Sequence, residues 1–199
     1  MTSPEQIQAA AAHYKDFCEV LGIDITKADT IDTPMRVAKM YANEFLVGQR
    51  PMDFTPTSFP ADSDKISQLV TVAGCRFVSL CAHHHLPIVG YAHVCYIPGE
   101  SLLGLSKLPR FVEWLSAKPT VQEDLTIEIA KTIQKTINPK FIGVKLTAGH
   151  ECMSCRGVGS YEALTSTTCF RSDNKDSYEG ARREFQENIQ EWYANKGAF

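Results

Sequence analysis

The residues best suited to chemistry in this sequence form two short clusters that lie far apart along the chain. Residues 81–85 read CAHHH, and residues 150–155 read HECMSC. In the first cluster, Cys81 and His84 have a C-x-x-H spacing, with which one tight turn can direct a thiolate and an imidazole at the same ion. The second cluster repeats that spacing with two cysteines. Because mixed sulfur and imidazole ligands favour zinc, we expect the clusters to be the halves of one metal site.

The number of protein ligands separates a structural zinc site from a catalytic one. Cys81, His84 and Cys152 would hold the ion through three ligands and leave its fourth position open for water, whose pKa zinc lowers toward neutrality. Cys155 as a fourth ligand would instead close the site, because C-x-x-H combined with C-x-x-C is also a structural zinc pattern. The spacing alone leaves both possibilities open.

Two histidines remain beside these ligands. His83 and His150 each flank a proposed ligand, so we expect both imidazoles within a few ångströms of the metal. Imidazole titrates near neutral pH and can give or take protons there. His13 and His93 have no such neighbours, and we expect them to be structural.

Composition sets limits on the class of protein. A chain of 199 residues is long enough for one well-buried core. Its net charge of -3 argues against a nucleic-acid partner, and no apolar run reaches the length that spans a membrane. The seven cysteines are odd in number and scattered, which favours reduced thiols and a cytoplasmic location. The first residues lack the pattern of a secretory signal.

The chain divides by pattern into three parts. Residues 1–50 predict two helices, one capped by Ser3 with Pro4 in its first turn, the other starting at Thr33. Residues 51–65 contain three prolines and little periodicity, which predicts a linker. Residues 66–199 predict the main domain.

Predicted strands and helices alternate in pairs along the main domain. Two strand-like runs are followed by two helical segments, two more strand-like runs and a final charged helix. This order predicts an α+β domain with a mainly antiparallel sheet. The strands are expected over about 66–80, 88–97, 141–148 and 162–171, and the helices from 106, over 121–137 and over 178–193.

Seven stretches, in this order, resemble the GTP cyclohydrolase I family. They are DTPMRVAKMY at 32–41, CAHH at 81–84, GLSKLPR at 104–110, VQE at 121–123, HEC at 150–152, RGV at 156–158 and TST at 165–167. The resemblance covers the chain from about Ile31 to the last helix. It implies the tunnelling fold, a ββααββ unit with helices on one face of an antiparallel sheet, here preceded by N-terminal helices. It also implies a homodecamer with active sites at subunit interfaces.

The resemblance implies a zinc-dependent hydrolase. Its substrate would be GTP, opened at C8 with release of formate to give 7,8-dihydroneopterin triphosphate, a precursor of folates, pterin cofactors and deazapurines. Cys81, His84 and Cys152 match the family's zinc ligands. His150 would protonate the purine N7, and His83 would assist later proton transfers.

The same resemblance supplies residues that would bind the substrate. Glu123, beside Gln122, would accept both the N1–H and N2 amino donors of guanine, and a site built for those donors should reject adenine. A triphosphate needs several cations and amide donors, and a helix N-terminus attracts anions. The residues that would surround the phosphates are Ser106, Lys107, Arg110, Arg156, Arg36 and Lys39.

Three positions depart from the family pattern. Ala82 stands where members usually have a glutamate, so whatever that carboxylate orients must be handled otherwise. Cys155 and His85 also replace residues that do not ligate metal. One alternative is therefore a reaction that stops at a formamidopyrimidine after ring opening. Another is a non-catalytic protein that binds zinc and nucleotide on the same fold.

Overall fold

The structure is a computed structural model that describes residues 2–62, 65, 67–172 and 178–196. The chain forms two compact units, Met1–Pro51 and Met52–Phe199. The stretch predicted as a linker, 51–65, thus falls largely in the second unit. It carries the short strand β1 (Ser58–Pro60), which pairs antiparallel with β4 (Ser101–Leu103). Residues 63–64 and 66, where the predicted linker meets the predicted domain, lie outside the described residues.

The first unit is helical, and its first helix begins as the sequence indicates. Helix α1 (Pro4–Val20) has the predicted capping box: the Ser3 hydroxyl accepts a hydrogen bond from the Gln6 amide, and the Ser3 amide donates to Gln6 Oε1 at 2.8 Å. These bonds satisfy amide groups that lack partners within the helix. The helix ends just before Gly22, whose φ of +69° suits glycine.

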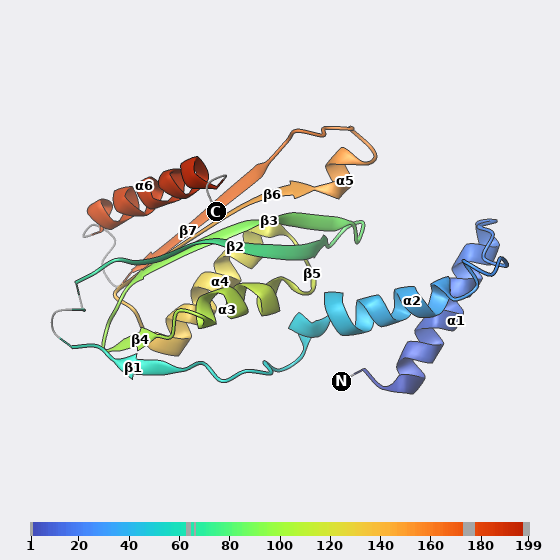
Figure 1. Ribbon diagram of the computed structural model, residues 1–199, viewed down its shortest axis with the longest axis horizontal. Helices are drawn as coiled ribbons and strands as arrows, with labels where there is room; N and C mark the ends of the chain where they lie inside the picture. The colour runs from blue at the N-terminus through green and yellow to red at the C-terminus, as the bar shows by residue number, and fades with distance from the viewer. Residues whose placement is uncertain (1, 63–64, 66, 173–177, 197–199) are drawn as a thin grey trace. The chain divides into compact units, whose positions relative to one another are not determined.

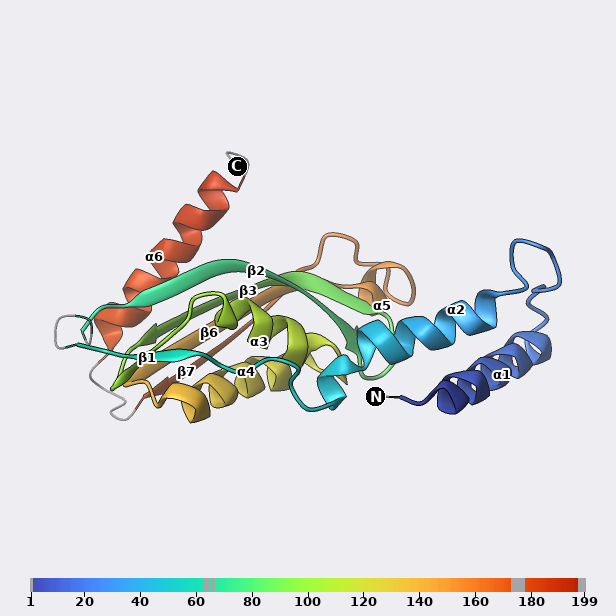
Figure 2. The same ribbon diagram turned by 60° about the horizontal axis from the view of Figure 1, so that its bottom comes forward.

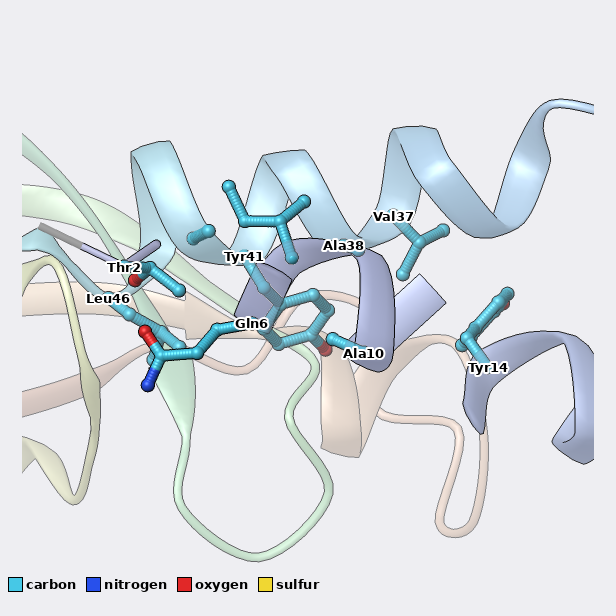
Figure 3. A pocket seen from close by; sticks show the side chains of 10 residues that line it. Thr2, Gln6, Ala10, Tyr14, Val37, Ala38, Tyr41 and Leu46 are labelled. Carbon is cyan, nitrogen blue, oxygen red and sulfur yellow. The ribbon is translucent and has the colours of Figure 1, made fainter. Parts of the chain in front are cut away.

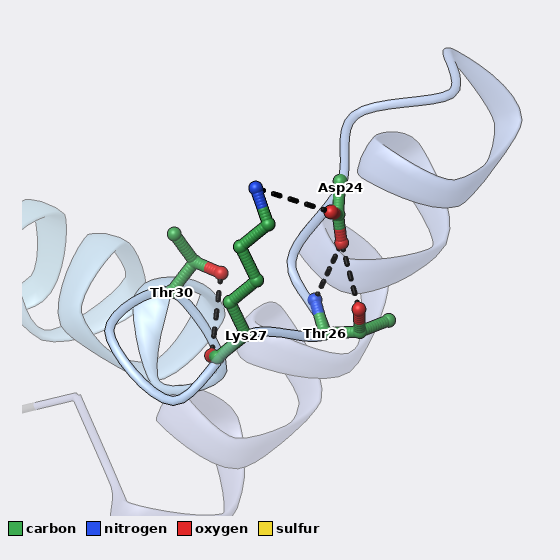
Figure 4. A network of polar contacts seen from close by, with 4 residues as sticks. All are labelled: Asp24, Thr26, Lys27 and Thr30. Carbon is green, nitrogen blue, oxygen red and sulfur yellow. Dashed lines mark hydrogen bonds and ion pairs between the residues drawn. The ribbon is translucent and has the colours of Figure 1, made fainter.

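A polar turn reverses the chain after α1 (Figure 4). The Asp24 carboxylate accepts hydrogen bonds from the amide and hydroxyl of Thr26 at 3.0 and 2.8 Å and lies 3.7 Å from Lys27 Nζ. The bonds from Thr26, first the amide and then the hydroxyl, hold the pKa of Asp24 below its ordinary value. The Thr30 hydroxyl donates to the Lys27 carbonyl at 3.4 Å, so local bonds set the path between the helices.

Helix α2 (Thr33–Met40) starts with a proline in its first turn and continues through a π-helical turn, Tyr41–Phe45, and a 3-10 turn, Val47–Gln49. A pocket of about 300 Å³ lies between α1 and α2. Figure 3 shows Tyr14 of α1 and Tyr41 among the side chains that line it. The two helices therefore contact each other along largely apolar surfaces.

A five-stranded sheet forms the second unit, with strand order β5-β2-β3-β6-β7. The four long strands pair antiparallel, and the short β5 is parallel to β2. The order β2, β3, α3, α4, β6, β7 confirms the predicted ββααββ arrangement of the tunnelling fold. The strands are β2 (Val70–Cys81), β3 (Pro87–Ile97), β5 (Pro119–Thr120), β6 (Phe141–His150) and β7 (Thr165–Ser172).

Helices cover both faces of this sheet (Figures 1 and 2). Helices α3 (Lys107–Ser116) and α4 (Gln122–Ile137) lie against one face, as predicted for the pair. Helix α6 (Glu179–Asn195) lies against the other, where Phe185 and Ile189 pack on Cys95 and Phe141. The helix predicted over 121–137 is confirmed as α4, and its residues at four-residue spacing, Leu125, Ile129, Ile133 and Ile137, all lie in the core.

A bulge in β2 makes room for helix α6. The pairing of β2 with β3 shifts register between Val72 and Cys75, and Gly74 there has a φ of +79°. A Cβ at Gly74 would lie 2.4 Å from the indole of Trp192. Glycine therefore allows both the left-handed backbone and the close approach of the α6 side chain.

Among the described residues, no helix combines the length and apolar character needed to cross a membrane.

Candidate metal centre and active site

Strand pairing brings the two cysteine and histidine clusters to one end of the sheet. Strand β2 ends at Cys81, and the following turn leads into β3, which pairs with β6 so that Ile88 lies opposite His150. The short helix α5 (Glu151–Ser154) follows β6 directly. The turn after β2 and helix α5 therefore emerge at the same end (Figures 1 and 2).

The structure groups the three residues predicted to bind metal. Ligand atoms of Cys81, His84 and Cys152 all lie within 4.8 Å of one another. Such spacing suits a single ion, since zinc binds sulfur at about 2.3 Å and imidazole nitrogen at about 2.0 Å. Cys81 is buried, Cys152 is half-buried and His84 is exposed. Two thiols and one imidazole that converge from separate segments are a donor set suited to zinc.

Local hydrogen bonds favour the metal-binding form of Cys81. Burial raises the pKa of its thiol, but the amides of His83 and His84 and then their side chains outweigh burial and lower the pKa to about 6. The sulfur lies 3.7 Å from His83 Nδ1. The pKa of Cys152 is raised, by burial and then by the neighbouring Cys81 sulfur. A cation between the two sulfurs would favour the thiolate of both.

Cys155 is directed elsewhere. Its side chain is exposed, and its thiol donates a hydrogen bond to the Glu151 carbonyl at 2.9 Å. Among the described residues, the group that could hold a metal comprises only the three predicted ligands. This geometry favours a site with a free fourth position over a closed one.

Two positions that depart from the family pattern, Ala82 and His85, lie in the turn between β2 and β3. Ala82 is exposed, and its amide donates to the Thr120 carbonyl at 3.1 Å, which ties the turn to β5. His85 has a left-handed φ of 52°, and its amide donates to the Cys81 carbonyl at 2.8 Å. The methyl group of Ala82 offers no acceptor where the family usually places a carboxylate.

His150 contacts a buried glutamine. His150 Nε2 lies 2.9 Å from Oε1 of Gln122, whose exposed fraction is 1%. Burial lowers the pKa of His150, and the charge of Glu123 opposes this shift. Glu123 is exposed in the first turn of α4, close enough to influence His150. The imidazole and the carboxylate predicted to act on the purine therefore lie near each other, and their action on a purine stays a prediction.

Of the six predicted phosphate-binding residues, Arg156 has a contact with the metal group. Its guanidinium donates a hydrogen bond to His84 Nε2 at 3.2 Å. Ser106 occupies the N-cap position of α3 without a side-chain capping bond, and Lys107 and Arg110 lie in the first turn. Within the described part of the chain, no hydrogen bond or ion pair joins these three to the metal group. Their contact with phosphate stays a prediction.

Arg36 and Lys39 lie on α2 in the first unit. Arg36 Nη2 lies 3.6 Å from the Asp32 carboxylate, an exposed pair, and Nη1 donates to the Asp29 carbonyl at 3.4 Å. Exposed pairs of this kind contribute at most about 1 kcal/mol, so both cations remain available to an anionic ligand. Their predicted role also stays a prediction.

Sequence reasoning missed the buried network behind His150. Thr126 and Thr167 complete hydrogen bonds around Gln122, although no role was predicted for either threonine. Two features of the sequence could have indicated this network. Thr126 follows Gln122 by four residues on the same helix face, and Thr167 lies within the TST stretch.

Comparisons with known proteins agree on one family. The family described as GTP cyclohydrolase I matches residues 10–190. The chain is 46% identical over 153 residues to GTP cyclohydrolase 1 of Enterococcus faecalis, covering 76% of this chain and 81% of that protein. It is 42% identical over 159 residues to GTP cyclohydrolase 1 of a Hydrogenobaculum species, covering 80% and 85%. It is 37% identical over 177 residues to bifunctional protein FolKE of Lactococcus lactis, covering 88% of this chain but 50% of that protein.

Proposed function

Because the chain belongs to the GTP cyclohydrolase I family of enzymes, we propose that it uses zinc to hydrolyse GTP at C8, releasing formate and yielding 7,8-dihydroneopterin triphosphate. The observation that carries this proposal is the convergence of Cys81, His84 and Cys152, with His150 two residues before Cys152 in the chain. Zinc, when bound by these residues, would supply a water activated at neutral pH.

His150 handles protons at the purine. Its Nε2 is engaged by Gln122, so the other ring nitrogen, Nδ1, is the atom that exchanges a proton with the substrate. The lowered pKa of His150 favours a neutral imidazole. Nδ1 can therefore take the proton that the water releases as its oxygen bonds to C8, and then give that proton to N7. His83, beside the Cys81 sulfur, assists later transfers.

Glu123 and the cations bind the remainder of GTP. The Glu123 carboxylate accepts the two guanine donors, and Arg156 reaches the phosphates from beside His84. Ser106, Lys107 and Arg110 offer a helix N-terminus and two positive charges for the same anion. Arg36 and Lys39 complete the set, and we infer a cytoplasmic homodecamer in which such cations can come from a neighbouring subunit.

A paired measurement of metal and product tests this proposal. Purified protein loaded with zinc is incubated with GTP, and formate and the pterin chromophore are followed together. We expect both products to accumulate at equal rates, and we expect Cys152→Ser to lose zinc and both products. GTP left intact by protein that carries a full complement of zinc would refute the proposal, as would a zinc-bound protein that is only stabilised by GTP.

Ala82 supports one alternative. Without the carboxylate usual at this position, a later proton transfer would fail, and the reaction would stop at the ring-opened formamide. Mass spectrometry of the product separates the two outcomes, because the intermediate retains the formyl carbon. Accumulation of that species, and restoration of formate release by Ala82→Glu, would favour the shorter reaction.

A further inference from the structure

We propose that Gln122, Thr126 and Thr167 form a buried network that fixes which nitrogen of His150 carries the proton, and that Gln122 is a positioning residue and not a contact for guanine. The inference deepens the proposed function, since it concerns the proton donor and acceptor of that site. It departs from the family resemblance, which places Gln122 with Glu123 among the residues that would bind the substrate.

The orientation of the Gln122 amide follows from its neighbours. Its Nε2 lies 3.0 Å from the Thr165 carbonyl and 3.4 Å from the Leu146 carbonyl. Carbonyl oxygens only accept hydrogen bonds, so the NH₂ group must face them. Oε1 must therefore face His150 Nε2, 2.9 Å away. Because Oε1 also only accepts, His150 Nε2 must donate and so must carry a proton.

The hydroxyl groups of the two threonines also have fixed donor and acceptor roles. The Thr126 hydroxyl lies 2.7 Å from the Gln122 backbone carbonyl, to which it must donate. That hydroxyl has one proton, so the contact of 2.6 Å between Thr126 and Thr167 requires the Thr167 hydroxyl to donate. Thr167 Oγ1 is then left as an acceptor for Gln122 Nε2 at 3.1 Å. Each hydrogen bond in the network therefore has only one possible donor.

Burial makes this arrangement costly to change. Gln122 and Thr126 are each 1% exposed, and a buried polar group without a partner costs about 1–3 kcal/mol. Rotating the Gln122 amide would set NH₂ against a protonated nitrogen of His150 and set Oε1 against two carbonyls. Gln122 Nε2 has three acceptors for its two protons, so the side-chain amide has no remaining donor and no exposed surface with which to contact a purine.

The consequence at the site is a defined proton acceptor. A neutral imidazole has one protonated nitrogen, so with Nε2 protonated the lone pair of His150 lies at Nδ1. Without the Gln122 oxygen, both tautomers would be populated and the ring would lose the bond that orients it. Changes in groups that orient a metal-binding imidazole typically cost about 10–100-fold in activity, and we expect a loss of the same order for His150.

Nitrogen NMR of the full-length protein tests the tautomer without any turnover. The protein carries ¹⁵N-labelled histidine and is studied at about pH 8, where imidazole is neutral. His150→Gln identifies the His150 signals. We expect Nε2 in the protonated range and Nδ1 in the unprotonated range. We expect Gln122→Met to mix the tautomers and Gln122→Glu, which keeps an oxygen toward His150, to preserve Nε2–H.

Thr167→Val tests the far end of the network against a matched control. The neighbouring Thr168 is exposed on the opposite face of β7, so Thr168→Val makes the same chemical change outside the network. We expect Thr167→Val to shift the His150 tautomer equilibrium, whereas Thr168→Val leaves it unchanged. Thr167→Ser, which retains the hydroxyl, should restore the parent spectrum. Equal spectra for the two valine variants would overturn the network.

Steady-state kinetics separate positioning from substrate binding. We expect Gln122→Met to lower kcat for GTP about 10–100-fold while KM changes less than about twofold. A raised KM with unchanged kcat would show a binding contact and overturn the inference. The NMR result tests the inference independently of the proposed function. A protein that holds His150 as Nε2–H but leaves GTP intact would refute the proposed function alone. A parent protein with the proton on Nδ1 of His150 would refute the inference alone.

Discussion

Acid should destabilise this fold through one buried histidine. His93 is 0% exposed and its ring packs edge-on against Trp192 of α6, with ring centroids 5.0 Å apart. The Gly74 amide donates to its Nδ1 at 3.3 Å, so the neutral ring carries its proton on Nε2. Burial, and then the charge of Lys145, lower the pKa of His93 to about 4. Protonation of His93 at Nδ1 would place that N–H against the N–H of Gly74, so that two donors would face each other.

The sign and size of the effect follow from linkage. The unfolded chain binds a proton at His93 with a pKa of about 6.5, whereas the folded protein binds one only near pH 4. The contribution of His93 is therefore fully present above pH 6.5 and is lost progressively as pH falls toward 4. The difference of about 2.5 units amounts to about 3 kcal/mol in total, of which about 2 kcal/mol is lost between pH 7.5 and 5.

Urea unfolding at pH 7.5 and pH 5, at fixed protein and zinc concentration, measures this loss. His93→Gln removes the titration and keeps an acceptor for the Gly74 amide, and His13→Gln, on the exposed face of α1, is the matched control. We expect the His93→Gln protein to lose about 2 kcal/mol less than the parent over this interval, while His13→Gln follows the parent. Equal losses in the parent and the His93→Gln protein would refute the reasoning.

Three further changes have defined outcomes. Cys155→Ser should leave one zinc bound per subunit, measured by metal analysis, because its thiol is directed to a backbone carbonyl; loss of zinc would contradict the open site. Gly74→Ala should lower the free energy of unfolding by about 2–3 kcal/mol, whereas Gly180→Ala, which meets no atom within 4 Å, should not; equal values would contradict the account of the bulge. Glu123→Gln should lower kcat/KM for GTP about 10–100-fold, and an unchanged preference for GTP over ATP would remove Glu123 from guanine recognition.

Short-range sequence patterns predicted the helices and strands of this chain reliably. Leu125, Ile129, Ile133 and Ile137 recur every four residues in α4 and are buried, and the capping box at Ser3 forms as the sequence indicates. The ββααββ order likewise follows from alternating periodicities. The grouping of Cys81, His84 and Cys152 was predictable because Cys81 and His84 share one turn, and the pairing of β3 with β6 brings that turn to the end of β6.

Contacts of long range were not predictable from the residues alone. Periodicity gives α6 an apolar side but cannot tell which face of the sheet it covers, and that choice depends on Gly74 making room for Trp192. The bond between Thr126 and Thr167 joins residues 41 positions apart, and it depends on the register of β6 with β7. Polar side chains of this kind look like ordinary helix and strand surface in sequence.

X-ray absorption at the zinc edge of the loaded protein distinguishes an open zinc site from a closed one. We expect two sulfur neighbours at about 2.3 Å, from Cys81 and Cys152, with the nitrogen of His84 and one light atom from solvent at about 2.0 Å. A spectrum with three sulfur neighbours, unchanged in position but reduced to two by Cys155→Ser, would contradict a centre that keeps one position open for chemistry.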